Sequence, residues 1–222
     1  MKIAVLAGAS GLIGKQLMYK LLESTFYQKV IVLVRKEIPI KHSKIEQLVI
    51  DFDHLAHYQE QLQANDFFCC LGTTMKKAGS KDAFYKVDFT YCLELAKTAS
   101  QNHAKSFNLV SAIGSDANSS IYYSKVKGDL EKALEELHFP QLNIFQPSIL
   151  IGNRVEFRLG ERIGIGIAQV ISPLLIGGLQ KYKPIYAAQV ANAMMNAAQR
   201  DANTRVKRYE FEQIMELQYN LV

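Results

Sequence analysis

The sequence predicts an α/β protein with a doubly wound parallel sheet, and two features carry that prediction. Short apolar runs that can be buried on both faces alternate with segments of helical periodicity along most of the chain. A glycine-spaced turn at residues 8–14 joins the first run to the first periodic segment. Repeated strand, helix and strand units with short connections require parallel strands and right-handed crossovers.

The elements follow in order from the N-terminus. Strands are expected at residues 2–7, 29–34, 47–50, 66–71, 106–110 and 142–145, with a late edge strand at 208–212. Helices are expected at 12–23, 54–63, 81–100, 122–137 and 187–200. Since no repeat or low-complexity linker interrupts the 222 residues, we expect a single domain over 1–222 in which about 148–222 form a small substrate or lid region.

The turn at 8–14 has the spacing Gly8-x-x-Gly11-x-x-Gly14. Glycines let the backbone approach a bulky anion, and the free amides of the following helix favour negative charge, so the turn is suited to a pyrophosphate. The phosphate loop of nucleoside triphosphatases does not match, because Lys15 is followed by Gln16 in place of Ser or Thr. The alternative is a helix-start turn that binds no ligand.

Two cations follow the second predicted strand, Arg35 and Lys36. In dinucleotide-binding folds this position faces the adenosine ribose, where an acid binds the 2′-hydroxyl and a guanidinium accommodates a 2′-phosphate. The pair therefore favours NADP over NAD. Two surface cations without a ligand are the alternative.

Ligands of such sheets bind beyond the carboxyl ends of the strands. Six singled-out residues fall at those ends: Gly8, Arg35, Asp51, Gly72, Ser111 and Pro147.

One constellation is suited to proton transfer. Tyr123 and Lys127 lie four residues apart and share one helix face, where the ammonium can lower the pKa of the phenol. The phenol can then donate a proton to a carbonyl oxygen while hydride arrives, and Ser111 can polarise the same carbonyl. An ordinary helix face beside a strand-end serine is the alternative.

These motifs resemble the short-chain dehydrogenases/reductases of the extended or atypical type. The matching segments are residues 8–14, 51–52, 71–73, 108–114, Tyr123-x-x-x-Lys127 with Glu131 beyond, and 146–148. The segments 70–74 and 127–131, and Pro147-x-x-Leu150 followed by arginines, look closest to the Tat-interacting-protein branch, whose members are short NADP(H) binders. A Rossmann fold is the architecture that the resemblance implies.

The resemblance also implies residue roles. The pyrophosphate is expected at Gly8, Ser10, Gly11, Ile13 and Gly14, with Leu12 also in the cofactor site. Arg35 and Lys36 are expected at the 2′-phosphate, Asp51 and Phe52 at the adenine, Leu71, Gly72 and Thr73 on the route to the nicotinamide ribose, and Pro147 and Ile149 at the carboxamide. Tyr123 is the expected acid/base, Lys127 its partner and ribose ligand, and Ser111 the group that steadies substrate. The family's relay asparagine is not evident after the fourth strand, and its large substrate domain is missing.

The C-terminal quarter carries two further patterns. Arg154, Arg158 and Arg162 recur every four residues, as in a basic ridge for an anionic substrate or acidic partner, or in a solvated helix face. Residues 163–179 are uncharged and mostly apolar, but Pro173 and the glycines disfavour a membrane helix. We expect a buried or lid segment there, with shallow membrane contact as the alternative.

Composition excludes several classes. The net charge of +5 is scattered along the chain, so nucleic-acid binding is not expected. The three cysteines suit neither a disulfide framework nor a metal site and are expected as buried reduced thiols. Because Met1 leads directly into a core strand, no signal peptide is expected and the protein is expected in the cytoplasm.

Two functions from different classes fit this sequence. The first is an NADP(H)-dependent oxidoreductase that reduces a small carbonyl compound, with Tyr123 as acid/base. The second is an NADP(H)-binding redox sensor or scaffold that acts through a protein partner without turnover, because fold and cofactor do not guarantee catalysis. Monomer and homodimer are both open, as is a membrane-surface protein anchored through residues 163–179.

Overall fold

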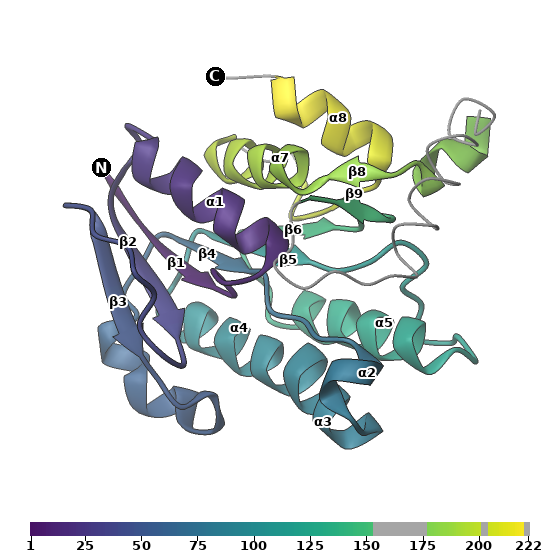
Figure 1. Ribbon diagram of the computed structural model, residues 1–222, viewed down its shortest axis with the longest axis horizontal. Coiled ribbons are helices and arrows are strands. Elements are labelled where there is room, and N and C mark those ends of the chain that lie inside the picture. The colour runs from purple at the N-terminus through teal and green to yellow at the C-terminus, as the bar shows by residue number, and fades with distance from the viewer. Residues whose placement is uncertain (153–176, 201–203, 220–222) are drawn as a thin grey trace.

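The computed structural model describes residues 1–152, 177–200 and 204–219. In these ranges, seven parallel strands form the central sheet (Figure 1). Their order is β3 (Ile45–Val49), β2 (Tyr27–Val34), β1 (Lys2–Ala7), β4 (Asp66–Cys69), β5 (Ser106–Val110), β6 (Gln141–Phe145) and β9 (Val206–Tyr209). A two-stranded parallel sheet pairs β7 (Leu150–Ile151) with β8 (Ile185–Tyr186). The predicted doubly wound fold is confirmed.

The strand order reverses at β1, which pairs with β2 on one side and β4 on the other. The chain therefore crosses over in one direction from β1 to β2 and β3, and in the opposite direction from β4 to β5 and β6. The loops that follow β1 and β4 diverge at the carboxyl end of β1. The crevice outside such a switch point is where doubly wound sheets bind ligands. The glycine turn after β1 lies at this place.

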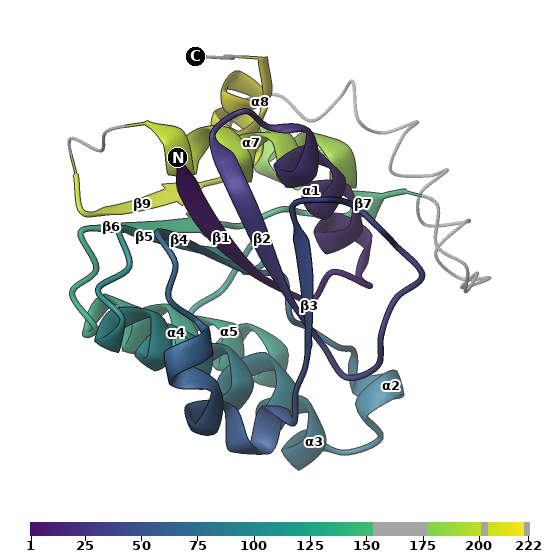
Figure 2. The ribbon, with the colours of Figure 1, turned by 90° about the vertical axis from the view of Figure 1, so that its left-hand side faces the viewer.

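Helices cover both faces of the sheet (Figures 1 and 2). One layer contains α1 (Leu12–Glu23), α7 (Ala187–Gln199) and α8 (Phe211–Tyr219), and the other contains α4 (Tyr91–Gln101) and α5 (Tyr122–Glu135). Strand β1 serves both cores: Leu6 packs on the α1 side, whereas Val5 and Ala7 pack on the α4 side. This two-sided burial explains why its sequence is a continuous apolar run.

The segment predicted as one long helix at 81–100 contains a π-helical turn. Helix α3 (Lys81–Tyr85) leads into the π-helical turn η2 (Lys86–Thr90), which continues into α4 with right-handed helical dihedrals at both junctions. The helix predicted at 54–63 is a 3₁₀ helix, η1 (Phe52–Gln61), whose first turn is capped by the Asp51 side chain. Two short helices were not predicted, α2 (Met75–Ala78) and the 3₁₀ helix η4 (Gly177–Tyr182).

The late strand lies at the sheet edge but is displaced from its predicted position. Strand β9 ends at Tyr209, and α8 begins at Phe211, inside the range predicted as strand. Ile214 and Leu217 on α8 are buried against the α1 and α7 layer, so this apolar face sustains a helix there.

Some predicted features fall outside the described residues. The ridge of Arg154, Arg158 and Arg162 is one, and most of the apolar segment 163–179 is another. Across the part of the chain that is described, no helix is both long enough and apolar enough to span a membrane.

Candidate nucleotide-binding and proton-transfer site

The turn after β1 has a backbone that only glycines accommodate. Gly8 has φ +88°, and a Cβ there would overlap the carbonyl oxygen of Cys70. A Cβ on Gly14 would overlap the carbonyl oxygen of Gly8, which also accepts the Gly11 amide at 2.9 Å. The turn is therefore folded tightly against the start of α1 and the end of β4.

The start of α1 can receive an anion. Its N-cap residue is Gly11, no side chain caps the first turn, and no acidic residue lies in that turn. Backbone amides at a helix N-terminus favour a negative group, and the missing side chains leave space for one. The residues therefore fit the diphosphate of a dinucleotide. The Ile13 side chain is in the core, so only its backbone amide is available to a ligand, and Leu12 packs against Gly152.

The residues expected around the adenosine lie at neighbouring strand ends. Arg35 and Lys36 are exposed directly after β2. The Asp51 carboxylate caps η1 by accepting the Asp53 amide at 3.0 Å, and its bond to this amide is the main reason its pKa is lowered. The Phe52 ring is buried against Tyr91, so its side chain belongs to the core.

A buried ion pair lies beside the end of β4. Lys127 Nζ is 2.8 Å from Asp88 Oδ1, and the two side chains are 4% and 1% exposed. Asp88 Oδ2 accepts the backbone amide of Thr73 at 2.7 Å. Gly72 is next to the pair, since a Cβ there would be 3.9 Å from Lys127 Nζ. The structure thus brings the predicted Lys127 to the predicted segment 71–73.

Tyr123 lies one turn before Lys127 on α5, with its ring 5.7 Å from that of Phe84. Burial raises the pKa of its phenol above the usual value; Lys127 opposes this shift and Asp88 adds to it. The expected lowering by Lys127 is therefore outweighed, and the sequence prediction of a lowered pKa is wrong for this structure. At neutral pH Tyr123 is a protonated phenol, the form that can donate a proton.

Ser111 is engaged elsewhere. Its hydroxyl donates to Glu131 Oε1 at 2.5 Å and lies 3.0 Å from the Ser115 hydroxyl. The buried Glu131 carboxylate also accepts from Gln146 at 2.9 Å and from Arg208 Nε at 3.2 Å. A serine has one hydroxyl proton, and in this structure Glu131 receives it, so the role of Ser111 at a substrate carbonyl stays a prediction.

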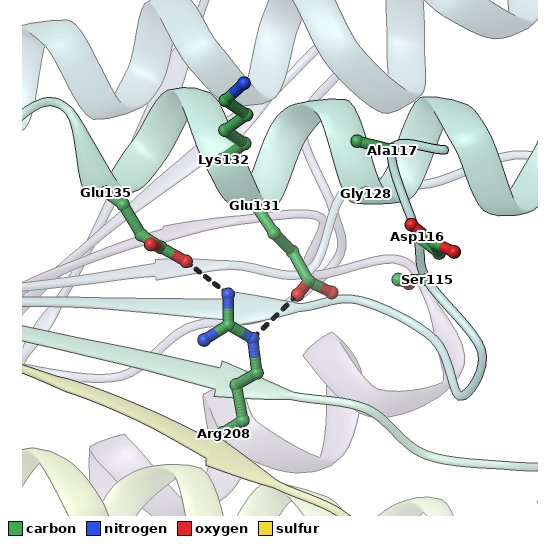
Figure 3. Close-up of a pocket in the computed structure, with 8 residues that line it drawn as sticks. All are labelled: Ser115, Asp116, Ala117, Gly128, Glu131, Lys132, Glu135 and Arg208. Carbon is green, nitrogen blue, oxygen red and sulfur yellow. Dashed lines mark hydrogen bonds and ion pairs between the residues drawn. The ribbon is translucent and has the colours of Figure 1, made fainter. Parts of the chain in front are cut away.

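A pocket of about 270 Å³ adjoins this network (Figure 3). Arg208 reaches from β9 between two carboxylates of α5, Glu131 and Glu135, and contacts both. Three of the charged groups that line the pocket, Arg208, Glu131 and Glu135, are thus paired with one another along α5. Pro147 is buried at the end of β6, where its carbonyl accepts the Ile113 amide, and Ile149 is exposed.

The glycine turn, the switch point and the Tyr123 and Lys127 helix together define a dinucleotide-binding protein of the short-chain dehydrogenase/reductase class. Residues 8–139 match the family model described as NAD(P)H-binding, and the chain belongs to this family.

Two kinds of curated relatives agree with this assignment. The chain is 40% identical over 164 residues to Protein HTATIP2 of Rattus norvegicus, covering 72% of this chain and 67% of the relative. It is 34% identical over 224 residues to Protein FMP52-1, mitochondrial, of Scheffersomyces stipitis, covering 96% and 97%. The predicted resemblance to the atypical branch is confirmed.

Solved structures share the fold at low identity. The Bordetella bronchiseptica enzyme WbmH in complex with NAD+ superposes with a TM-score of 0.72 at 15% identity, covering 95% of this chain and 75% of that one. The UDP-glucose 4-epimerase of Thermotoga maritima with UDP-glucose gives 0.71 at 16% identity, covering 97% and 81%.

The cytoplasmic location expected from the sequence is wrong, because the FMP52 relatives are named mitochondrial proteins. The expectation rested on the start of the chain and on reduced thiols. Cys69 and Cys92 are indeed free and buried, and Cys70 is partly buried. Reduced thiols are not restricted to one compartment, so they could not decide the location.

Sequence reasoning missed Asp88 and the role of Glu131. Asp88 lies 39 positions before Lys127, inside a segment that reads as an ordinary helix. A signal was present, because Asp88 is an acid flanked directly by the apolar residues Val87 and Phe89. Without the fold, nothing indicated which cation it faces.

Proposed function

We propose that the protein is an NADP(H)-dependent oxidoreductase that reduces a small carbonyl compound, with Tyr123 as the proton donor. The observation that carries the proposal is the position of Tyr123, which is near the buried Lys127 and Asp88 pair at the end of β4. This end of the sheet also carries the glycine turn.

Each part of the site has its own role in this reaction. Bound NADPH supplies hydride. The turn at Gly8, Gly11 and Gly14 holds the diphosphate with backbone amides, and Lys127 is within reach of the segment 71–73 that would line the ribose. Tyr123 donates its phenolic proton to the carbonyl oxygen as the negative charge develops there.

The raised pKa of Tyr123 fits the reductive direction. A phenol that stays protonated at neutral pH acts as an acid without prior proton uptake. Reduction should therefore be retained through neutral pH and lost only as the pH rises through the pKa of Tyr123.

The test of the proton donor is Tyr123→Phe, with Tyr122→Phe as the matched control. Tyr122 is the adjacent residue, and its hydroxyl donates to the Lys81 carbonyl, so its removal costs one exposed hydrogen bond. Carbonyl reduction should fall about 10²- to 10⁴-fold in Tyr123→Phe, while NADPH affinity stays nearly unchanged. Equal rates in the two variants would refute the role of Tyr123.

The proposed preference for NADP(H) rests on Arg35, with Lys36 beside it. Replacing Arg35 by Ala should weaken NADPH binding about ten- to a hundredfold, because one charge-assisted contact to the 2′-phosphate is lost. NADH binding should change little. Lys41→Ala, another exposed cation beyond the same strand, is the control. Equal losses for both nucleotides would contradict the assignment.

The redox-sensor hypothesis predicts a different result. NADPH would bind with the dependence on Arg35 described above, yet no aldehyde, ketone or quinone would be reduced, and Tyr123→Phe would have no kinetic effect. Nucleotide fluorescence titration combined with an absorbance assay at the NADPH band separates the two outcomes.

A further inference from the structure

Asp88 is a buried carboxylate that the mechanism above leaves without a role. It lies in the π-helical turn η2, between α3 and α4. A π-helical turn inserts one residue into a helix, changes the direction of the side chains and is frequent at functional sites. Here the turn accompanies a carboxylate that is directed away from solvent, since the Asp88 side chain is 1% exposed.

Both oxygens of Asp88 are held by different elements. Oδ1 contacts Lys127 Nζ of α5 at 2.8 Å, and Oδ2 accepts the Thr73 amide beyond β4 at 2.7 Å. Gly72 packs against the Asp88 carboxylate, since a Cβ at this position would lie 3.4 Å from Asp88 Oδ1. The carboxylate is thus fixed in orientation, and it fixes the lysine ammonium in turn.

We infer that Asp88 is a positioning residue that holds the Lys127 ammonium at the end of β4, beside Gly72 and the Thr73 amide. This inference rests on the proposed function of Tyr123, and it adds to that function the residue that holds the charge of Lys127. The resulting pair is neutral overall, so Tyr123 faces no net positive charge.

The groups around this corner are few among the described residues. Lys127 faces Asp88 of η2, the Cys92 thiol of α4 and Tyr123 of its own helix. Tyr123 faces the uncharged ring of Phe84 on α3 in addition to the ion pair. When the charge of Asp88 is removed, the Lys127 ammonium is left buried without a counter-charge, and burial favours the neutral amine.

The chain offers a matched control on the same helix. Lys125 and Asp129 form an ion pair at 3.2 Å on α5, but their side chains are 50% and 32% exposed. Asp129→Asn makes the same chemical change as Asp88→Asn in a solvated pair.

The test is the charge of Lys127 in the protein without nucleotide. The side-chain resonance of Lys127 is followed by NMR against pH in the native sequence, Asp88→Asn and Asp129→Asn. We expect Lys127 to lose its proton at a lower pH in Asp88→Asn than in the native sequence, because a buried ammonium without its counter-charge favours the neutral amine, and at the unchanged pH in Asp129→Asn. An unchanged titration of Lys127 in folded Asp88→Asn would overturn the inference.

A second measurement needs no variant of Asp88. The Lys127 side-chain resonance, assigned by its loss in Lys127→Met, is followed by NMR in the native sequence. Lys127 should remain charged at about pH 10.5, where exposed lysines are half titrated. Titration together with the exposed lysines would overturn the inference. Neither measurement contains nucleotide or substrate, so a failure of the proposed activity leaves both results readable.

Discussion

Lys127 and Glu131 lie one turn apart on the buried face of α5, yet the protein neutralises them in different ways. Within the described residues Lys127 is paired with one charged group, Asp88 of the π-helical turn η2. Glu131 accepts hydrogen bonds from Ser111, Gln146 and Arg208, which lie at or near the ends of β5, β6 and β9. One helix face therefore carries two buried charges. Lys127 lies at the proposed reaction site, and Glu131 connects residues of three strand ends.

The two networks also draw on different parts of the chain. Asp88, Thr73 and Lys127 all fall inside the matched NAD(P)H-binding segment, residues 8–139. In the second network Ser111 and Glu131 also fall inside this segment, whereas Gln146 and Arg208 fall outside it. We expect the first network to shape the proposed nucleotide site and the second to attach the C-terminal strand β9 to α5. Substitutions in each network should therefore affect different measurements.

The largest effect is expected for Lys127→Met. It leaves the Asp88 carboxylate buried without a cation, and breaking a buried ion pair in this way costs about 3–5 kcal/mol of unfolding free energy. Adding Asp88→Asn to Lys127→Met should restore most of that loss, because no unpaired charge remains. Urea unfolding of the two single variants and the double variant measures the coupling, and additive losses would show that the pair is not energetically coupled.

A smaller effect is expected for Glu131→Gln. The neutral amide is a weaker acceptor for Ser111 and Arg208, so unfolding free energy should fall by about 1–3 kcal/mol while NADPH affinity is kept. Glu135→Gln is the control, since its exposed contact to the same arginine contributes under about 1 kcal/mol. A large loss of NADPH affinity in Glu131→Gln would contradict the separation of the two networks.

The smallest effect is expected for an exposed ion pair that begins on the same π-helical turn as Asp88. The hydrogen bond from Lys86 is the main cause of the lowered pKa of Asp53, which also accepts from Tyr91. A carboxyl group whose pKa is lowered in the folded state stabilises the fold at pH values above its unfolded-state pKa of about 4. This contribution disappears as the pH falls through the folded-state pKa. Thermal unfolding of Asp53→Asn should therefore differ slightly from the native sequence at pH 7 and converge with it in acid. A difference that grows in acid would have the wrong sign.

Much of the fold could be predicted because its signals are local. The first strand and helix have the predicted bounds, residues 2–7 and 12–23, since an apolar run, a glycine turn and one apolar helix face are all visible within a few residues. The doubly wound parallel arrangement followed from the alternation of such segments, whereas the strand order is known from the structure. The displaced end of β9 shows the limit, because residues near a strand end become helical when their apolar face meets another helix.

The site could be predicted only in part. Tyr123 and Lys127 were found from their spacing, and the structure places Lys127 against the predicted segment 71–73. The net shift of the Tyr123 pKa is opposite to the expected one, because burial of the phenol, with a smaller contribution from the charge of Asp88, outweighs the lowering by Lys127. Ser111 was read as a free strand-end hydroxyl, although its acceptor lies 20 positions later.

By itself, the sequence determined the doubly wound architecture, the glycine turn and the residue types at the strand ends, because these depend on backbone freedom and on the periodicity of apolar side chains. The tertiary structure decided which charges meet. Asp88 pairs with Lys127 across 39 residues and Glu131 with Arg208 across 77, and such pairing depends on the distance between folded segments, which no local pattern encodes.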